Sequence, residues 1–228
     1  MNREIKHVFF DLDHTLWDFD KNSGLTFAKI FDIHKLNVDL KLFLSVYEPI
    51  NFRYWKLYRE EKVTKAALRY GRLKEAFDAI DVEVDDQLIH HLSEDYITHL
   101  TTFNNVFEGT HDILYYLQSK YKLHIITNGF EEAQTKKMES ANLISYFTTI
   151  TNSEMVGVKK PNPKIFNHAL VSANAEPLNS IMIGDNIEAD IQGALDVGMR
   201  AIFFDYANLN AETSYNRITK LIELKQFL

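Results

Sequence analysis

The chain has 228 residues, of which 46% are hydrophobic and 25% charged, and it carries a formal net charge of -7 at pH 7. This composition is typical of a globular protein and excludes a mainly disordered chain, while the acidic balance argues against broad binding of nucleic-acid phosphates. The absence of cysteine excludes disulfides, thiol catalysis and zinc sites with Cys ligands.

The sequence has no features of a membrane or exported protein. Residues 1–6 are charged and lack the apolar stretch of a signal peptide. No segment approaches the roughly 18 continuous apolar residues of a transmembrane helix. We therefore expect a cytoplasmic protein that makes no membrane contact.

Short apolar runs, each followed by polar residues, predict the strands of a parallel sheet. They do not alternate between apolar and polar residues, as is typical of strands buried on both faces. In chain order the runs are 8–10, 123–126, the weaker candidate 148–150, 181–183 and 201–204. Helical patterns accompany them at 110–120, 164–173, 188–197 and 215–227. This alternation predicts an α/β, doubly wound, Rossmann-like domain, in which ligands bind at the carboxyl ends of the strands.

Residues 17–105 differ from the rest because their pattern is almost entirely helical, most clearly at 39–59, 64–77 and 85–99. We therefore divide the chain into a core domain, residues 1–16 and 106–228, and a helical cap domain, residues 17–105, inserted after the first strand. The aromatic and basic run at 51–58 could line a cleft and meet a nucleobase. The helical spacing of its aromatic residues favours a place in the core of the helical domain instead.

Two acidic residues follow the first strand. Asp11 and Asp13 are two positions apart, so in extended chain their side chains share a face. Two close carboxylates repel unless a cation compensates, and an all-oxygen site suits Mg2+. A calcium loop of the EF-hand type is excluded, because Leu16 stands where Gly is required and Asn22 where Glu is required.

Three further polar segments follow later strands or loops. Thr127-Asn128-Gly129 ends a strand, where a hydroxyl and backbone N–H groups can hold phosphate oxygens. In Lys159–Pro163 two prolines fix the path of the chain beside Lys160. In Gly184–Asp190, Asp185 can supply another metal ligand, while Asp190 can either complement a helix N-terminus or orient Lys160.

These four segments, in this order, resemble the motifs of the haloacid dehalogenase superfamily of hydrolases, and the helical insertion lies where one subclass of that superfamily carries its cap. The resemblance implies that Asp11 attacks phosphorus and forms an aspartyl-phosphate. Asp13 then protonates the leaving oxygen and later deprotonates the hydrolytic water. An Asp at position 13 favours phosphate chemistry, because superfamily members that dehalogenate organic acids lack it.

The resemblance also implies roles for the other motif residues. Mg2+ is held by Asp11, the backbone carbonyl of Asp13, and Asp185. Thr127, with the backbone of Asn128 and Gly129, binds phosphate oxygens. Lys160 neutralises charge and Asp190 positions it.

The segment Asp11–Phe19 is similar to the pyrimidine 5'-nucleotidase branch, in which Trp-Asp-Phe follows the first motif. His14 departs from the Asp or Gly that is usual there. We expect Trp17, Phe19 and His14 to have packing roles. The expected substrate is a small phosphorylated molecule, with nucleoside monophosphates as the first choice. The expected assembly is a monomer or homodimer.

Three alternatives stay open from the sequence. The chain could be a sugar-phosphate phosphatase, or a phosphomutase that passes the phosphoryl group to a sugar. It could also be a non-catalytic binding protein on the same fold. The residues that argue against that interpretation are Asp11, Asp13, Lys160 and Asp185.

Overall fold

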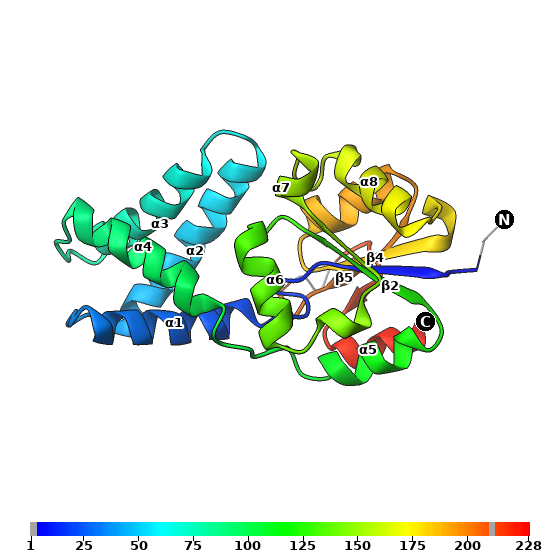
Figure 1. The fold of residues 1–228 in the computed structure, drawn as a ribbon, viewed down its shortest axis with the longest axis horizontal. Coiled ribbons are helices and arrows are strands. Elements are labelled where there is room, and N and C mark those ends of the chain that lie inside the picture. The colour runs from blue at the N-terminus through cyan, green and yellow to red at the C-terminus, as the bar shows by residue number, and fades with distance from the viewer. Residues whose placement is uncertain (1–3, 210–212) are drawn as a thin grey trace. The chain divides into compact units, whose positions relative to one another are not determined.

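A six-stranded parallel sheet forms the centre of one part of the molecule (Figure 1). In this computed structural model, residues 4–209 and 213–228 are described. The strands are β1 (His7–Phe10), β2 (Lys122–Thr127), β3 (Thr149–Asn152), β4 (Ser180–Gly184), β5 (Arg200–Phe204) and β6 (Arg217–Ile218). Their order across the sheet is β3-β2-β1-β4-β5-β6, so the chain leaves β1 first toward one edge and later toward the other. The predicted doubly wound α/β fold is confirmed.

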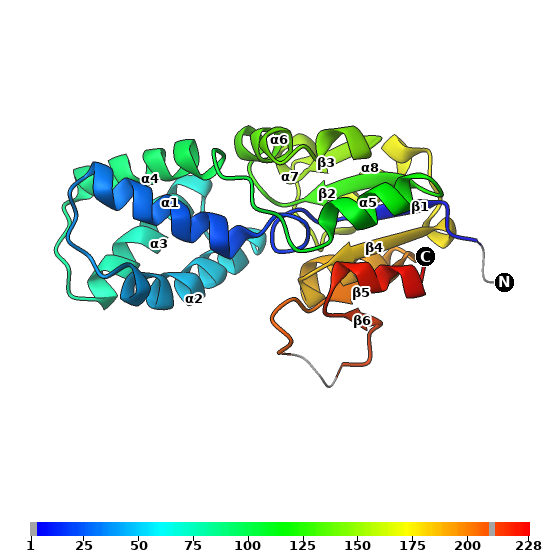
Figure 2. The ribbon, with the colours of Figure 1, turned by 90° about the horizontal axis from the view of Figure 1, so that it is seen from below.

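Helices cover both faces of this sheet (Figures 1 and 2). They are α5 (Thr110–Gln118), α6 (Glu131–Ser140), α7 (Ser153–Val156), α8 (Pro163–Ala173) and α9 (Gly193–Asp196), the last preceded by a π-helical segment, Ile187–Gln192. On the α8 side, buried side chains of several strands and helices meet in one apolar cluster that includes Phe9 of β1, Phe166 of α8 and Ile191 of the π-helical segment. Burial of these apolar surfaces fixes the strand ends that carry the polar motifs.

The C-terminal region differs from the predicted helix at 215–227. Residues 217–218 form β6, and Leu221–Gln226 form a 3-10 helix. The reason is the open edge of β5: the backbone N–H of Phe203 donates to Asn216 and that of Asp205 donates to Ile218. Leu221 and Leu224 are buried three residues apart, a spacing that suits a 3-10 turn as well as an α-helix.

The chain divides into two compact units. One holds the sheet and includes the chain up to Phe19 and again from Asn104, and the other is Asp20–Phe103. The four long helices of the N-terminal half are α1 (Phe19–Ile33), α2 (Leu40–Arg59), α3 (Lys65–Ala79) and α4 (Asp86–Leu100). Side-chain caps begin the last three of these, because Asp39, Thr64 and Asp85 each accept a backbone N–H of the first turn.

An aromatic cluster forms the core of the helical unit. Phe27 lies at its centre, with ring centroids 4.8 Å from Phe43, 4.6 Å from Tyr47 and 4.8 Å from Tyr96. The expectation that the aromatic residues of 51–58 form this core is wrong for Phe52, which is 58% exposed. Among the described residues, no helix is long and apolar enough to cross a membrane.

Candidate active site

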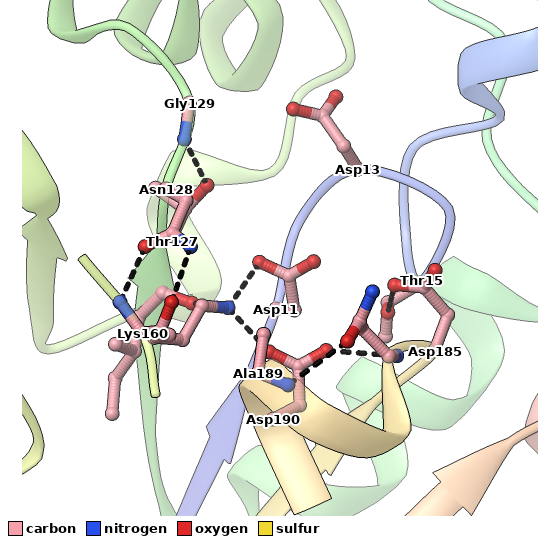
Figure 3. Close-up of polar contacts among 12 residues, drawn as sticks. Asp11, Asp13, Thr15, Thr127, Asn128, Gly129, Lys160, Asp185, Ala189 and Asp190 are labelled. Carbon is pink, nitrogen blue, oxygen red and sulfur yellow. Dashed lines mark hydrogen bonds and ion pairs between the residues drawn. The ribbon is translucent and has the colours of Figure 1, made fainter. Parts of the chain in front are cut away.

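The polar ends of three neighbouring strands meet at one edge of the sheet (Figure 3). Asp11 directly follows β1, Thr127 ends β2, and Asp185 directly follows β4. Because β1 pairs in parallel with both β2 and β4, the carboxyl ends of these strands lie side by side. The fold therefore gathers motifs that are more than 100 positions apart in the sequence.

Lys160 lies at the centre of this edge, and its side chain is only 2% exposed. Its Nζ donates to Asp11 Oδ1 at 2.7 Å and to the carbonyl oxygen of Ile126 at 2.7 Å. It also lies 2.6 Å from Asp190 Oδ1. Three acceptors thus surround the ammonium group, which fixes both the lysine and one oxygen of Asp11.

The main chain on both sides of Lys160 is held by Asn128. The Asn128 side chain accepts from the backbone N–H of Lys160 at 2.7 Å and donates to its carbonyl oxygen at 3.0 Å. The peptide bond between Lys160 and Pro161 is cis. The Asn128 side chain therefore anchors the loop that carries Lys160.

Asp190 is held in a space that Gly184 leaves open. A Cβ at position 184 would lie 2.3 Å from Asp190 Oδ2, so a larger residue would displace this carboxylate. The same Oδ2 accepts the backbone N–H of Asn186 at 3.0 Å. The contacts of Asp190 with Lys160 and with the chain after β4 are those that a lysine-positioning role requires.

The site carries more negative charge than Lys160 can neutralise. Carboxylate oxygens of Asp11, Asp185 and Asp190 lie within 4.8 Å of one another. Burial, opposed in part by Lys160 and reinforced by Asp190, raises the pKa of Asp11 to about 7. Burial and the neighbouring carboxylates also raise the pKa of Asp185 well above its ordinary value. Burial alone would lower the pKa of Lys160, but Asp11 and Asp190 raise it.

This imbalance fits a divalent cation. Asp190 is already engaged by Lys160 and Asn186, whereas Asp11 has one oxygen bound to Lys160, and Asp185 accepts only the Thr15 hydroxyl, at 3.3 Å, among the side chains of the described residues. Hard oxygen ligands at the end of a strand are those that Mg2+ prefers. A cation here would also offset the burial and the repulsion that together raise the pKa of Asp11 and of Asp185.

Asp13 has different partners from Asp11, and its carboxylate points away from Asp11 (Figure 3). Lys137 Nζ donates to Asp13 Oδ1 at 2.7 Å, and Gln134 Nε2 donates to Asp13 Oδ2 at 3.0 Å. Gln134 Nε2 also donates to the Thr127 hydroxyl at 2.6 Å, and this hydroxyl accepts the backbone N–H of Gly129 at 3.1 Å. Both α6 residues are buried.

Gln134 and Lys137 belong to the site but are not among the residues predicted from the sequence. Helix α6 has only a weak apolar stripe, and two of its four buried positions are polar. The available signal was the spacing of three residues between them, which places two long polar side chains on one helix face.

The remaining residues of the first motif pack within the sheet unit. His14 adopts a left-handed backbone conformation, with φ 61°, which explains why a Gly suits this position. Its ring stacks on Tyr206, and the Tyr206 hydroxyl lies 3.1 Å from His14 Nδ1. Trp17 is fully buried and packs edge-on against Phe19.

A comparison with protein families matches residues 5–198 to the haloacid dehalogenase-like hydrolases. The chain is 32% identical to the pyrimidine 5'-nucleotidase YjjG of Escherichia coli over 193 residues, which is 84% of this chain and 82% of that protein. It is 30% identical to a glyceraldehyde 3-phosphate phosphatase of Pyrococcus furiosus over 235 residues, covering 99% of this chain and 92% of that one.

A solved structure of similar fold is that of the HAD-hydrolase YfnB from Bacillus subtilis, bound to magnesium. It superposes with a TM-score of 0.88 at 26% identity and covers 99% of both chains.

Proposed function

Because the chain belongs to the haloacid dehalogenase-like hydrolases, we propose that it is a Mg2+-dependent phosphomonoester hydrolase that acts on pyrimidine nucleoside 5'-monophosphates. Asp11 is the nucleophile in this proposal, and Asp13 is the acid and base. The observation that carries it is the fixed Asp11 carboxylate, which has one oxygen held by buried Lys160 at the carboxyl end of the central strand.

In the first step, the free oxygen of Asp11 forms a bond to phosphorus. The ester P–O bond breaks, and its electron pair goes to the leaving oxygen, which takes a proton from Asp13. In the second step, water attacks phosphorus and gives a proton to Asp13, while the electron pair of the breaking bond returns to Asp11. Lys160 and the donors near Thr127 compensate the charge on the phosphoryl oxygens, which is the main requirement of phosphoryl transfer.

We propose that Asp11, Asp185 and the backbone carbonyl of Asp13 hold the Mg2+ ion. The surplus of buried negative charge at Asp11 and Asp185 supports this assignment. When bound, the ion supplies charge neutralisation for the nucleophile and the phosphate.

The choice of a nucleotide rests on the first motif and on the relative from Escherichia coli, a pyrimidine 5'-nucleotidase. The second candidate is a small sugar phosphate, because the relative from Pyrococcus furiosus is a glyceraldehyde 3-phosphate phosphatase and matches nearly the whole chain. We propose that the helical unit, Asp20–Phe103, acts as the cap and selects between such substrates.

A panel of nucleoside 5'-monophosphates, deoxynucleoside 5'-monophosphates and triose phosphates, assayed for phosphate release, tests this proposal. We expect the highest kcat/KM for UMP, CMP or dTMP, loss of activity with EDTA, and recovery with Mg2+. Asp11→Asn should lower kcat by at least about a thousandfold, because it removes the attacking group. Preference for triose phosphates would favour the second candidate, and activity that survives chelation would reject the metal.

A further inference from the structure

Two side chains of helix α6 donate hydrogen bonds to the Asp13 carboxylate, one to each of its oxygens. Lys137 donates to one oxygen at 2.7 Å, and Gln134 donates to the other at 3.0 Å. The Lys137 side chain is 4% exposed and that of Asp13 is 20% exposed, so this is a largely buried pair. A carboxylate that is hydrogen-bonded at both oxygens has little conformational freedom. The two α6 side chains therefore fix the position of the Asp13 carboxylate.

The ammonium group of Lys137 lies between the Asp13 carboxylate and two aromatic rings. Its ammonium group lies 4.5 Å from the ring centroid of Trp17 and 5.4 Å from that of Phe19. In the described part of the chain, Asp13 is the carboxylate with which it pairs. A buried ammonium group is costly unless it is paired, and an apolar side chain would fill this space beside two aromatic rings more readily. We conclude that Lys137 is buried here in order to hold the Asp13 carboxylate in place.

Gln134 connects Asp13 to Thr127. Its amide nitrogen donates to both residues, so its two N–H groups are used, while its Oε1 is buried without a hydrogen-bond partner. The opposite, flipped orientation of the Gln134 amide is excluded, because Oε1 would then face the Asp13 carboxylate, which can only accept hydrogen bonds. Gly129 makes room for this amide: a Cβ there would lie 2.2 Å from Gln134 Nε2.

The Thr127 hydroxyl is oriented as a result. Its oxygen accepts from both Gln134 Nε2 and the Gly129 backbone N–H, which occupies its two lone pairs. Within residues 4–209 and 213–228, no group accepts its proton in return. The proton is thus left for an external acceptor at the end of β2, such as a phosphoryl oxygen.

We propose that Lys137 and Gln134 are positioning residues for the second half of the reaction. They hold the Asp13 carboxylate where it takes a proton from the hydrolytic water, and Gln134 also leaves Thr127 as a donor to the phosphoryl group. This inference rests on the proposed function. Water attacks the phosphorus of the Asp11 phosphoryl group, the bond from phosphorus to the Asp11 oxygen breaks with its electron pair returning to Asp11, and the water proton passes to Asp13.

The test uses 4-nitrophenyl phosphate, whose leaving group departs without needing protonation. Attack by Asp11 then needs little help from Asp13, whereas hydrolysis of the phosphoenzyme still needs it. The variants are Lys137→Met, Lys137→Arg and Gln134→Met. Lys136→Met is the matched control, because it makes the same substitution on the same helix at an exposed position.

In Lys137→Met we expect a rapid burst of about one 4-nitrophenol per active site, followed by turnover at least about tenfold slower than wild type. The apparent KM should fall together with kcat, so that kcat/KM changes little, because the phosphoenzyme accumulates. Gln134→Met should also slow turnover after the burst, but its kcat/KM should fall as well, because Thr127 loses the partner that orients its hydroxyl. Lys137→Arg should recover part of kcat, and Lys136→Met should match wild type.

A merely structural role for Lys137 predicts a different result. The first turnover would then slow as much as later ones, kcat/KM would fall, and no burst would form, which would overturn the inference. Wild-type kcat in Lys137→Met would overturn it as well.

Failure of the proposed function gives a separate signal, which is a wild-type chain that releases phosphate from neither aryl nor alkyl phosphates. In that case, crystal structures of Lys137→Met and Lys136→Met decide the positioning claim. We expect the Asp13 carboxylate to move in Lys137→Met and not in Lys136→Met. An Asp13 carboxylate that keeps its position in Lys137→Met would reject the positioning role of Lys137.

Discussion

At the scale of single residues, the centre of the site is the ammonium group of Lys160, which forms ion pairs with two buried carboxylates. Lys160 contacts Asp11 and Asp190, and Asp185 adds a third carboxylate nearby. Removing Lys160 would leave these carboxylates uncompensated, whereas removing one carboxylate charge leaves a group that Lys160 still compensates. The surplus charge makes the protein's stability dependent on pH.

Asp11→Asn should stabilise the protein when Mg2+ is absent. The pKa of Asp11 is raised to about 7 in the folded state, above its unfolded value, so folding loses stability as pH rises from about 4 through 7. The neutral Asn removes this cost. At pH 8 with EDTA, we expect the melting temperature of Asp11→Asn to exceed that of wild type by about 2–4 °C or more.

Addition of Mg2+ supplies the control for that measurement. The ion should raise the melting temperature of wild type more than that of Asp11→Asn, which reduces the difference. An Asp11→Asn variant that melts well below wild type in EDTA would contradict the electrostatic account.

At the scale of elements, the sequence predicts those parts of the fold that follow a simple periodicity. Buried parallel strands are continuous apolar runs, so β1, β2, β4 and β5 could be located, and with them the motif residues at their ends. Helix α6 could not, because the face it buries carries Gln134 and Lys137. β6 could not either, because its strand conformation comes from pairing with β5 and not from its own pattern.

The sheet also contains a buried histidine pair that joins three strands. His7 Nδ1 lies 3.0 Å from His124 Nε2, and His124 Nδ1 lies 2.8 Å from the Thr149 hydroxyl. Burial, with smaller effects of His7 and Lys122, lowers the pKa of His124 to about 4. Burial also lowers the pKa of His7. Both rings are therefore neutral in the folded state near pH 7.

We expect acid to destabilise the protein through this pair. The folded pKa of His124 lies below the unfolded value of about 6.5, so its stabilising effect is complete above that pH and is lost as pH falls toward about 4. Between pH 7.5 and 5, urea unfolding should show a loss about 2 kcal/mol larger in wild type than in His124→Gln. Equal losses in the two proteins would refute this role.

At the scale of the whole molecule, the two units have different kinds of core. The sheet unit is aliphatic and aromatic around its strands, whereas the helical unit contains a buried guanidinium among its aromatic rings. Arg72 donates to Asn51 at 2.8 Å and lies 4.9 Å from the ring centroid of Tyr96. Its Nε is buried without a hydrogen-bond partner. Sequence periodicity located the helices but not this polar centre.

Arg72→Met should leave the stability of the chain nearly unchanged or higher. Met keeps much of the side-chain volume and removes a buried charge with incomplete hydrogen bonding, so we expect the free energy of unfolding to stay within about 1 kcal/mol of wild type or to rise. Arg72→Ala is the control, and its cavity should cost about 2–5 kcal/mol. A loss in Arg72→Met as large as that in Arg72→Ala would show that the charge itself stabilises the unit.

The account as a whole depends on Asp11 carrying the phosphoryl group. The most direct measurement is chemical trapping: Asp13→Asn, which should accumulate the intermediate, is mixed with 4-nitrophenyl phosphate and Mg2+, quenched in acid and reduced with borohydride. Reduction converts an aspartyl-phosphate to homoserine, which mass spectrometry of the peptide locates. We predict homoserine at position 11 alone, and none in Asp11→Asn. Phosphate release without homoserine, or homoserine at another aspartate, would contradict the proposed mechanism.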